Sequence, residues 1–214
     1  MKKMTFLLLL AIASICSHGQ NPITSVITPQ TRFTSTYVER GIFCYVISKK
    51  DGNLYKRDYE EKWDGKRELK KEELILTSVR EVYGGAATFF AIRNDGSLWA
   101  WGSNSFFGTV GDNTGIDKDK PVRILDNVKE VTTDIYCIGS VWAVKNDGTV
   151  YAWGNNFNAI LGFGDTETRY APEKLPIANV KYISITQSVN LLTNIIATTF
   201  SGDEYQWSGN GNNK

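Results

Sequence analysis

The stretch that decides the fold reads NDGSLWAWGSN from Asn94 to Asn104, and it returns as NDGTVYAWGNN from Asn146 to Asn156. Two weaker copies read FSGDEYQWSGN over residues 200–210 and KDGNLYKRDYE over residues 50–60. The third residue of every copy is a glycine and the sixth is aromatic; the glycines are Gly52, Gly96, Gly148 and Gly202. A repeat of about fifty residues indicates a propeller, a solenoid or another array of repeats.

Each strong copy predicts a strand, a tight turn and a returning strand. In the third unit we expect strands over residues 128–131, 138–144 and 149–153, with a turn at Asn146-Asp147-Gly148, because glycine adopts positive φ and Asn and Asp tolerate it. The return strand carries apolar side chains on both faces. A strand of this kind is covered on both faces, which is typical of small sheets stacked against one another.

The rest of the unit is less regular. Residues 159–162 and their counterparts at 108–111 suggest a further inner strand, and residues 164–172 suggest a surface connection. The pattern shows no convincing long amphipathic helix; the only candidate is the segment from Lys66 to Leu76, inside the weak first copy. We therefore predict an all-β fold of about three to four four-stranded, propeller-type blades.

We divide the chain into repeat units at about 34–77, 78–127, 128–179 and 180–214, after a leader at 1–19. Two of these units are complete, the first is eroded and the last is truncated, so we expect an incomplete propeller arc. Trp101 and Trp153 are expected at equivalent buried positions of adjacent blades, with Trp207 at the same place in the last unit.

The pattern D-G-x-aromatic-A-W-G-x-N, a following G-x-x-G and a proline before the next V-x-x-V or V-x-x-I resembles the regulator of chromosome condensation repeat. The resemblance is strongest over residues 79–176 and extends over most of the chain. It implies a β-propeller, usually of seven four-stranded blades, that binds partners through its loops. Eukaryotic nuclear members of this family are guanine-nucleotide exchange factors, and secreted bacterial members include protein inhibitors of enzymes. We interpret this chain as a member of the secreted bacterial type with an incomplete set of blades.

The first nineteen residues resemble a signal peptide. Lys2 and Lys3 precede an apolar run of ten residues, 6–15, which is too short to span a bilayer. We predict cleavage after Gly19 and export to the periplasm, the cell surface or the medium. A lipid anchor on Cys16 is the alternative, although Ile15 stands where lipoprotein signals carry a small residue. No later segment is apolar enough to span a membrane.

Composition excludes several kinds of chemistry. The chain has 24 Lys and Arg against 23 Asp and Glu residues, which gives no attraction to nucleic acid. Its single histidine, His18, lies in the expected leader, so we expect no His-dependent catalysis, no metal site, no cofactor and no enzymatic activity. A disulfide between Cys44 and Cys137 is possible after export, but the two cysteines occupy different positions of the repeat.

The acidic residues have local explanations. Asp51, Asp95 and Asp147 stand beside the turn glycines, where we expect them to support the turn. The acids in 111–113 and 164–167 lack the spacing of a calcium loop, so we expect them in solvated loops. The mixed charged run 56–74 suggests a solvated excursion, or else an insert that docks a partner through Trp63.

Three aromatic residues are the candidate binding site: Phe106 and Phe107 follow the second W-G-x-N, and Phe157 follows the third. They either pack between blades or form an exposed rim that binds another protein. We expect an exported, non-enzymatic scaffold that binds an unidentified protein; the alternative is a degenerate or structural propeller fragment without a partner of its own. Self-association, or a strand supplied by residues 21–40 to the truncated last blade, could cover the exposed ends.

Overall fold

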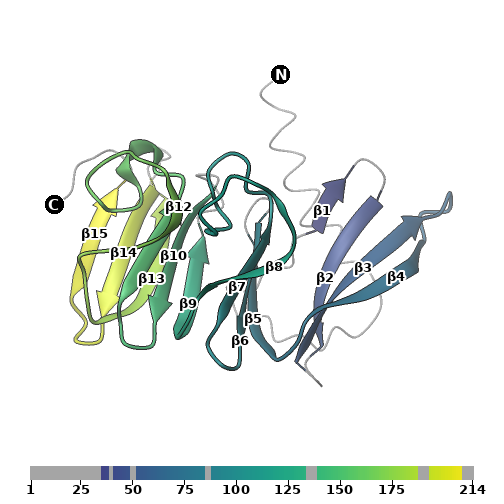
Figure 1. Ribbon diagram of the computed structural model, residues 1–214, viewed down its shortest axis with the longest axis horizontal. Helices are drawn as coiled ribbons and strands as arrows, with labels where there is room; N and C mark the ends of the chain where they lie inside the picture. The colour runs from purple at the N-terminus through teal and green to yellow at the C-terminus, as the bar shows by residue number, and fades with distance from the viewer. Residues whose placement is uncertain are drawn as a thin grey trace. The chain divides into compact units, whose positions relative to one another are not determined.

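A computed structural model describes residues 35–38, 41–48, 52–84, 88–133, 139–187 and 193–208, giving only the strands for the first two segments. The chain divides into two compact units, Met1–Val79 and Arg80–Lys214. The described residues form fifteen strands and one 3₁₀ turn, so the all-β prediction is confirmed (Figure 1). Within them, no helix is long and apolar enough to cross a membrane.

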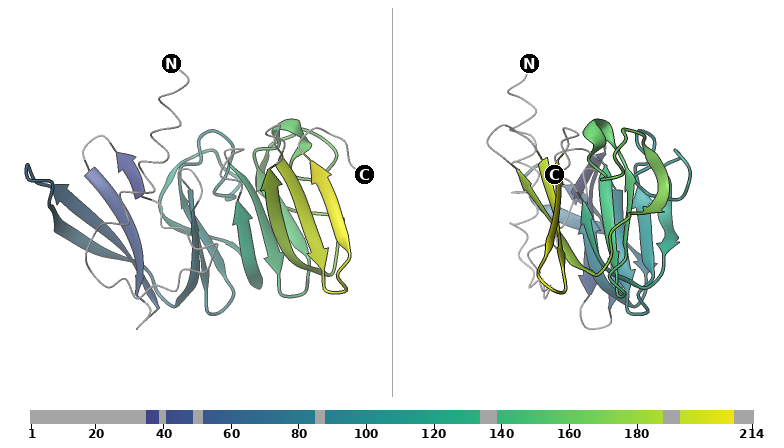
Figure 2. Two further views of the ribbon diagram at one scale, coloured as in Figure 1. Left: turned by 180° about the vertical axis from the view of Figure 1, so that it is seen from behind. Right: turned by 90° about the vertical axis from the view of Figure 1, so that its left-hand side faces the viewer.

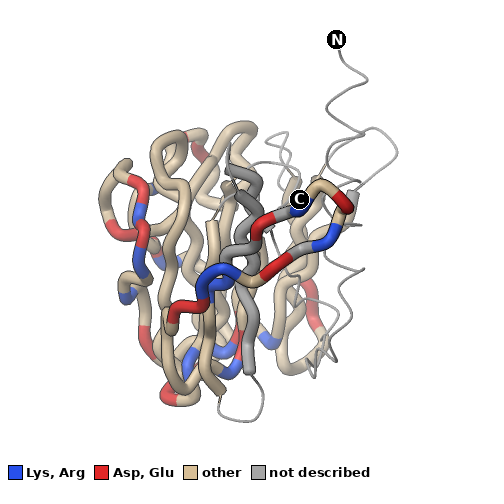
Figure 3. Tube along the Cα trace, turned by 90° about the vertical axis from the view of Figure 1, so that its right-hand side faces the viewer, with Lys and Arg blue, Asp and Glu red and all other residues tan. Residues whose placement is uncertain are grey.

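The first unit is one antiparallel sheet in the order β1-β2-β3-β4. Its strands are β1 (Ser35–Val38), β2 (Gly41–Ser48), β3 (Asn53–Glu61) and β4 (Arg67–Leu76). Strands β3 and β4 form a long hairpin along which acidic and basic residues are interspersed (Figure 3). Ion pairs such as Lys62–Glu68 and Lys70–Glu60, both 2.6 Å, line the hairpin, and Trp63 at its tip is 99% exposed.

The second unit contains three antiparallel sheets, each a simple meander. The first has β5 (Val79–Gly84), β6 (Thr88–Arg93), β7 (Leu98–Gly102) and β8 (Lys118–Leu125). The second has β9 (Val128–Thr133), β10 (Ser140–Lys145), β11 (Val150–Gly154) and β12 (Arg169–Lys174). The third has β13 (Val180–Gln187), β14 (Thr193–Thr199) and β15 (Glu204–Ser208). These sheets stack face to face (Figure 2).

Two apolar clusters hold the three sheets of the second unit together. Phe90, Ile92 and Leu98 meet Val141 and Trp153 in the first cluster, where the rings of Phe90 and Trp153 pack edge to face at 6.2 Å. The second cluster joins β9–β12 to β13–β15 and contains Trp142, Val150, Ile183, Ile195 and Trp207. The middle sheet is therefore buried on both faces, as the doubly apolar strand 149–153 predicted.

The turn glycines connect each sheet to the next segment of chain. Gly96 has φ +80° and Gly148 has φ +77°, which glycine adopts without strain. The Gly96 carbonyl accepts a hydrogen bond from the amide of Val128 at 2.8 Å, and the Gly148 carbonyl accepts one from Val180 at 3.0 Å. Within the first unit, Gly52 accepts the same bond from Val79 at 2.6 Å. In the second unit, each turn thus fixes the start of the strand that opens the next sheet.

Two sequence-based expectations about strands and connections were wrong. The one helix candidate, by contrast, is a strand as an all-β fold requires, because residues 67–76 form β4 and pair with β3. Residues 159–162 and 108–111 are buried loops and not strands. The expected surface connection 164–172 instead runs into β12, and Pro172 and Pro121 lie inside the fourth strands of their sheets.

Four further expectations concern residues that are largely outside the described ranges. Cys137 and Cys16 are not described, and neither is the side chain of Cys44, so the disulfide and the lipid anchor stay predictions. Of the segment 21–40, the described part is β1, and it pairs with β2 in the first sheet rather than with the last sheet. The leader 1–19 is also outside the described residues.

Candidate functional site

The candidate site lies on two equivalent loops of the second unit, residues 103–117 between β7 and β8 and residues 155–168 between β11 and β12. Both loops are at the upper end of their sheets in Figure 1, opposite the β6–β7 and β10–β11 turns. Each begins at a glycine with positive φ, Gly102 at +107° and Gly154 at +92°, where the strand stops. A Cβ on Gly154 would be 1.8 Å from the carbonyl oxygen of Gly139, so only glycine fits there.

A buried asparagine organises each loop. The side-chain oxygen of Asn104 accepts a hydrogen bond from the amide of Val110 at 2.8 Å, and that of Asn156 accepts one from Leu161 at 2.9 Å. The Asn104 amide group donates to Asp112 Oδ1 at 3.0 Å, and the Asn156 amide group donates to Asp165 Oδ1 at 3.0 Å. The asparagine of W-G-x-N therefore supports the loop, a role that the sequence analysis did not assign.

Each loop aspartate is in turn paired with a cation from the following strand. Lys118 lies 2.7 Å from Asp112, and Arg169 lies 2.7 Å from Asp165. Hydrogen bonding to Arg169 lowers the pKa of Asp165 to about 2, despite the opposing effect of burial. Burial acts to raise the pKa of Asp112, but Lys118 and Thr114 outweigh it and the pKa is lowered. Both carboxylates stay charged and hold their loops in one conformation.

The tryptophans attach these loops to the neighbouring sheet. The indole N–H of Trp153 donates to the Thr109 carbonyl at 2.9 Å, and that of Trp207 donates to the Ile160 carbonyl at 2.8 Å. Thr109 and Ile160 are thus equivalent loop positions. Trp101 is also buried and stacks on Phe89, with ring centroids 5.6 Å apart. All three tryptophans named from the sequence have buried rings.

The two loops present one phenylalanine each at the same position. Counting back from Thr109 and Ile160, Phe106 corresponds to Phe157, with Ser105 as an inserted residue. Phe106 is 78% exposed and Phe157 is 73% exposed. Phe107 is different: it is half-buried, lies beside Gly139 of the next sheet and contacts the Phe106 ring at 6.3 Å. The structure therefore exposes one ring on each of the two loops, and it brings Phe107 into contact with Phe106.

Other exposed apolar side chains of this region escaped the sequence analysis. Ile116 is exposed in the same loop as Phe106, and Tyr170 at the start of β12 lies against Gly108 and Gly115. Tyr170 also accepts a backbone hydrogen bond from Asn113 at 2.8 Å. Their positions depend on how the loop crosses to the next sheet, which no local pattern indicates. We call Phe106, Phe157 and Phe107, which contacts Phe106, the phenylalanine rim.

The turn acids have the supporting role expected of them. Asp95 Oδ1 accepts a hydrogen bond from the Ser97 amide at 2.9 Å, and Asp147 Oδ1 accepts one from the Thr149 amide at 2.9 Å. The expectation for these two residues is therefore confirmed, whereas Asp51 is outside the described residues. No group of three potential metal-ligating side chains was found among the described residues.

Comparison with known proteins identifies the repeat. Two models of the regulator of chromosome condensation (RCC1) repeat match residues 147–189 and 79–107. The Ultraviolet-B receptor UVR8 of Arabidopsis thaliana is 30% identical over 112 residues, which is 52% of this chain and 25% of that protein. The E3 ubiquitin-protein ligase HERC2 of Homo sapiens is 27% identical over 129 residues, 59% of this chain and 3% of that protein.

Solved structures share the fold. Human WBSCR16 superposes with a TM-score of 0.56 at 14% identity, over 82% of this chain and 47% of that one. Prp20p of Saccharomyces cerevisiae superposes with a TM-score of 0.51 at 17% identity, over 83% of this chain and 46% of that one. This chain thus spans less than half of the length of the relatives described here. Residues 79–107 and 147–189 therefore match RCC1 repeats, and the stacked antiparallel sheets agree with the fold of these solved structures.

Proposed function

We propose that this protein is an exported, non-enzymatic repeat scaffold that binds a protein partner through the phenylalanine rim. One observation carries the proposal: Phe106 and Phe157 occupy equivalent positions of adjacent sheets, and both are largely exposed. A repeat fold by itself does not specify a function, because function depends on the site. The repetition of an exposed aromatic ring on two neighbouring loops provides such a site.

The energetics favour protein binding at this rim. Burying a phenylalanine side chain contributes about 1.5–3 kcal/mol, so two rings can anchor an interface. The loops beneath them are fixed by Asn104 and Asn156 and by the pairs Lys118–Asp112 and Arg169–Asp165. Little conformational entropy is then lost on binding, which raises affinity for a given contact area. The structurally similar yeast protein Prp20 binds Gsp1p and histones, and it has also been solved bound to Kap60.

Export and the absence of catalysis belong to the same proposal. The run of apolar residues 6–15 after Lys2 and Lys3 supports removal of a leader after Gly19. N-terminal sequencing of the secreted or periplasmic protein should then begin at Gln20, and a protein still beginning at Met1 would contradict export. The restriction of histidine to His18 supports a binding role, since the mature chain would have no imidazole for acid–base catalysis.

Binding is tested with paired variants in a cross-linking pull-down from the envelope fraction or culture medium of the producing cells. The double variant Phe106→Ser/Phe157→Ser should lose the captured partner while its melting temperature stays unchanged, because both rings are exposed. The matched control is Phe200→Ser, which removes an exposed phenylalanine from the turn between β14 and β15, outside the two rim loops. Equal capture by the wild type and the rim variant would exclude the rim as the binding site.

A further inference from the structure

The last sheet of the second unit differs from its neighbours in its number of strands. In the sheets β5–β8 and β9–β12 the third strand pairs with a fourth: β7 pairs with β8, and β11 pairs with β12. In the third sheet, β15 pairs with β14, and no described residue pairs with its other edge. Figure 1 shows β15 as the outermost strand of this stack. A free edge presents unpaired backbone N–H and C=O groups that can accept another strand.

The outward face of this sheet does not suit another stacked sheet. In the middle sheet, Val144, Val150 and Ala152 face β13–β15 and are buried in the second cluster. The equivalent outward positions in the last sheet are Ile196, Thr198, Glu204 and Gln206, of which Glu204 is charged and exposed. Burying an unpaired carboxylate between sheets is strongly unfavourable. The free edge, rather than the face, is therefore the place for a partner.

The two existing fourth strands define what fits beside a third strand. They read KDKPVR over residues 118–123 and RYAPEK over residues 169–174, so both have a basic residue, a proline three positions later and a second basic residue two positions after that. The second basic residue lies opposite the aromatic residue of the third strand: Arg123 opposite Trp99, and Lys174 opposite Tyr151. The matching aromatic residue in β15 is Tyr205.

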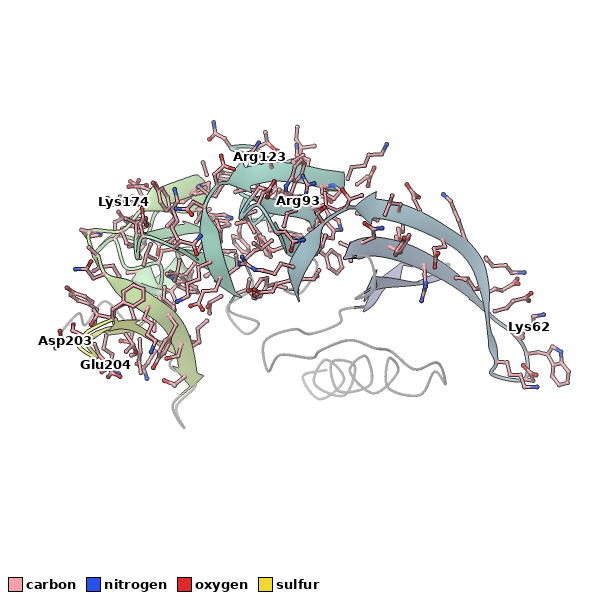
Figure 4. The ribbon with its side chains drawn as sticks, turned by 90° about the horizontal axis from the view of Figure 1, so that it is seen from below. Lys62, Arg93, Arg123, Lys174, Asp203 and Glu204 are labelled. Atoms are coloured by element: carbon pink, nitrogen blue, oxygen red, sulfur yellow. The ribbon has the colours of Figure 1, made fainter. Side chains whose placement is uncertain are left out.

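The side chains of β15 are complementary to such a strand. Tyr205 is 46% exposed, so the face of its ring is open to a cation. Asp203 and Glu204 lie at the start of the strand (Figure 4), both exposed. Among the described residues neither of them has a basic side chain within ion-pair distance. The edge thus combines free backbone groups, an open aromatic ring and two negative charges.

We propose that the free edge of β15 binds an extended basic segment of a partner protein, of the form Lys/Arg-x-x-Pro-x-Lys/Arg, as an added antiparallel strand. The main chain of the segment supplies affinity by strand addition, and its basic residues supply specificity. Its proline is compatible with this position, because the added strand becomes the new sheet edge. This site is separate from the phenylalanine rim and does not depend on it.

The test uses the full chain and a fluorescein-labelled peptide ETRYAPEKL, which copies Glu167–Leu175. Fluorescence anisotropy should show saturable binding. Replacing both basic residues of the peptide by Glu should weaken binding at least tenfold. The protein variant Asp203→Lys/Glu204→Lys should reverse this preference and bind the acidic peptide better than the basic one.

A second measurement separates strand addition from simple charge attraction without altering the protein. Methylation of alternate backbone nitrogens of the peptide removes amide donors and leaves its charges intact, so binding should fall at least tenfold. Equal binding of the methylated peptide, or no saturable binding up to millimolar peptide, would overturn the proposal. The rim variant Phe106→Ser/Phe157→Ser should bind the peptide like the wild type, so failure at one site is distinguishable from failure at the other.

Discussion

The sheets β9–β12 and β1–β4 derive from the same repeat, yet they end their third strands differently. In the middle sheet, Gly154 stops β11 after five residues and the chain leaves the sheet as a loop. In the first sheet, Asp58 occupies the equivalent position, and β3 continues for nine residues beside β4. Both hairpins keep the turn glycine. The hairpin therefore depends on the turn glycine, whereas the loop and its contacts with the neighbouring sheet depend on W-G-x-N.

The largest expected effect is at Trp153. It is fully buried, packs on Phe90 and donates to the Thr109 carbonyl, so Trp153→Ala should reduce the free energy of unfolding by about 3–5 kcal/mol. Trp63→Ala, in the hairpin of the first sheet, should change it by about 0.5 kcal/mol or less. Urea unfolding followed by circular dichroism measures both. Similar losses for the two variants would mean that the sheets do not differ as described.

The next effect is at the strand end. Gly154→Ala places a Cβ against the Gly139 carbonyl at positive φ, and we expect a loss of about 2–4 kcal/mol from backbone strain and overpacking. The reciprocal change Asp58→Gly should not create a loop and should cost only about 0.5–1 kcal/mol, as for glycine in a strand. Thermal unfolding distinguishes the two, and a harmless Gly154→Ala would show that the close approach is not required.

Asn156 gives a smaller effect. Asn156→Ala removes buried hydrogen bonds to Leu161 and Asp165 and should cost about 1–3 kcal/mol. Glu60 stands at the equivalent position of the first sheet and pairs with Lys70 at the surface, so Glu60→Ala should cost about 1 kcal/mol or less. Chemical denaturation checks both values. A larger cost at Glu60 would contradict the assignment of loop support to W-G-x-N.

The smallest effect concerns pH. The pKa of Asp165 is about 2 in the folded protein, below its ordinary value of 3.8. Its pair with Arg169 therefore stabilises the fold above about pH 4, and this contribution is lost as the pH falls toward 2. Since Asp165 is partly exposed, we expect only about 0.2–1 kcal/mol. Asp165→Asn should flatten the difference in melting temperature between pH 5 and pH 2.5.

The control for this pH effect is the first sheet. Lys62 lowers the pKa of Glu68, an exposed residue of the β3–β4 hairpin. Glu68→Gln should leave the acid part of the stability profile close to that of the wild type. An equal flattening by both variants would attribute the pH dependence to general surface charge rather than to the loop of the middle sheet.

Local patterns predicted the parts of the fold that depend on neighbouring residues. Asp95 and Asp147 bond to amides two residues away, so their role follows from the short sequence around each turn glycine. The doubly apolar strand around Trp153 likewise predicted burial on both faces. The buried run 159–162 was mistaken for a strand because apolar residues indicate burial without indicating backbone conformation.

The remaining differences arise from contacts between distant residues. The segment 67–76 is rich in helix-forming Lys, Glu and Leu, but its pairing with β3 overrides that preference. The equivalence of Phe106 and Phe157 is hidden in the sequence by the inserted Ser105, and it becomes visible only when Thr109 and Ile160 are aligned by their bonds to tryptophans. The residues of the candidate site could be named from the sequence, but the equivalence of their positions could be recognised only from the structure.

The bond between a turn glycine and the first valine of the next repeat has an evolutionary consequence. It joins only main-chain atoms, as in Gly52–Val79, Gly96–Val128 and Gly148–Val180. Side chains can therefore change on either side of the junction without removing this hydrogen bond. The first repeat retains the bond although it lacks W-G-x-N. A gene that duplicates or deletes one whole repeat therefore recreates the same junction each time, so copy number can change while each join stays intact.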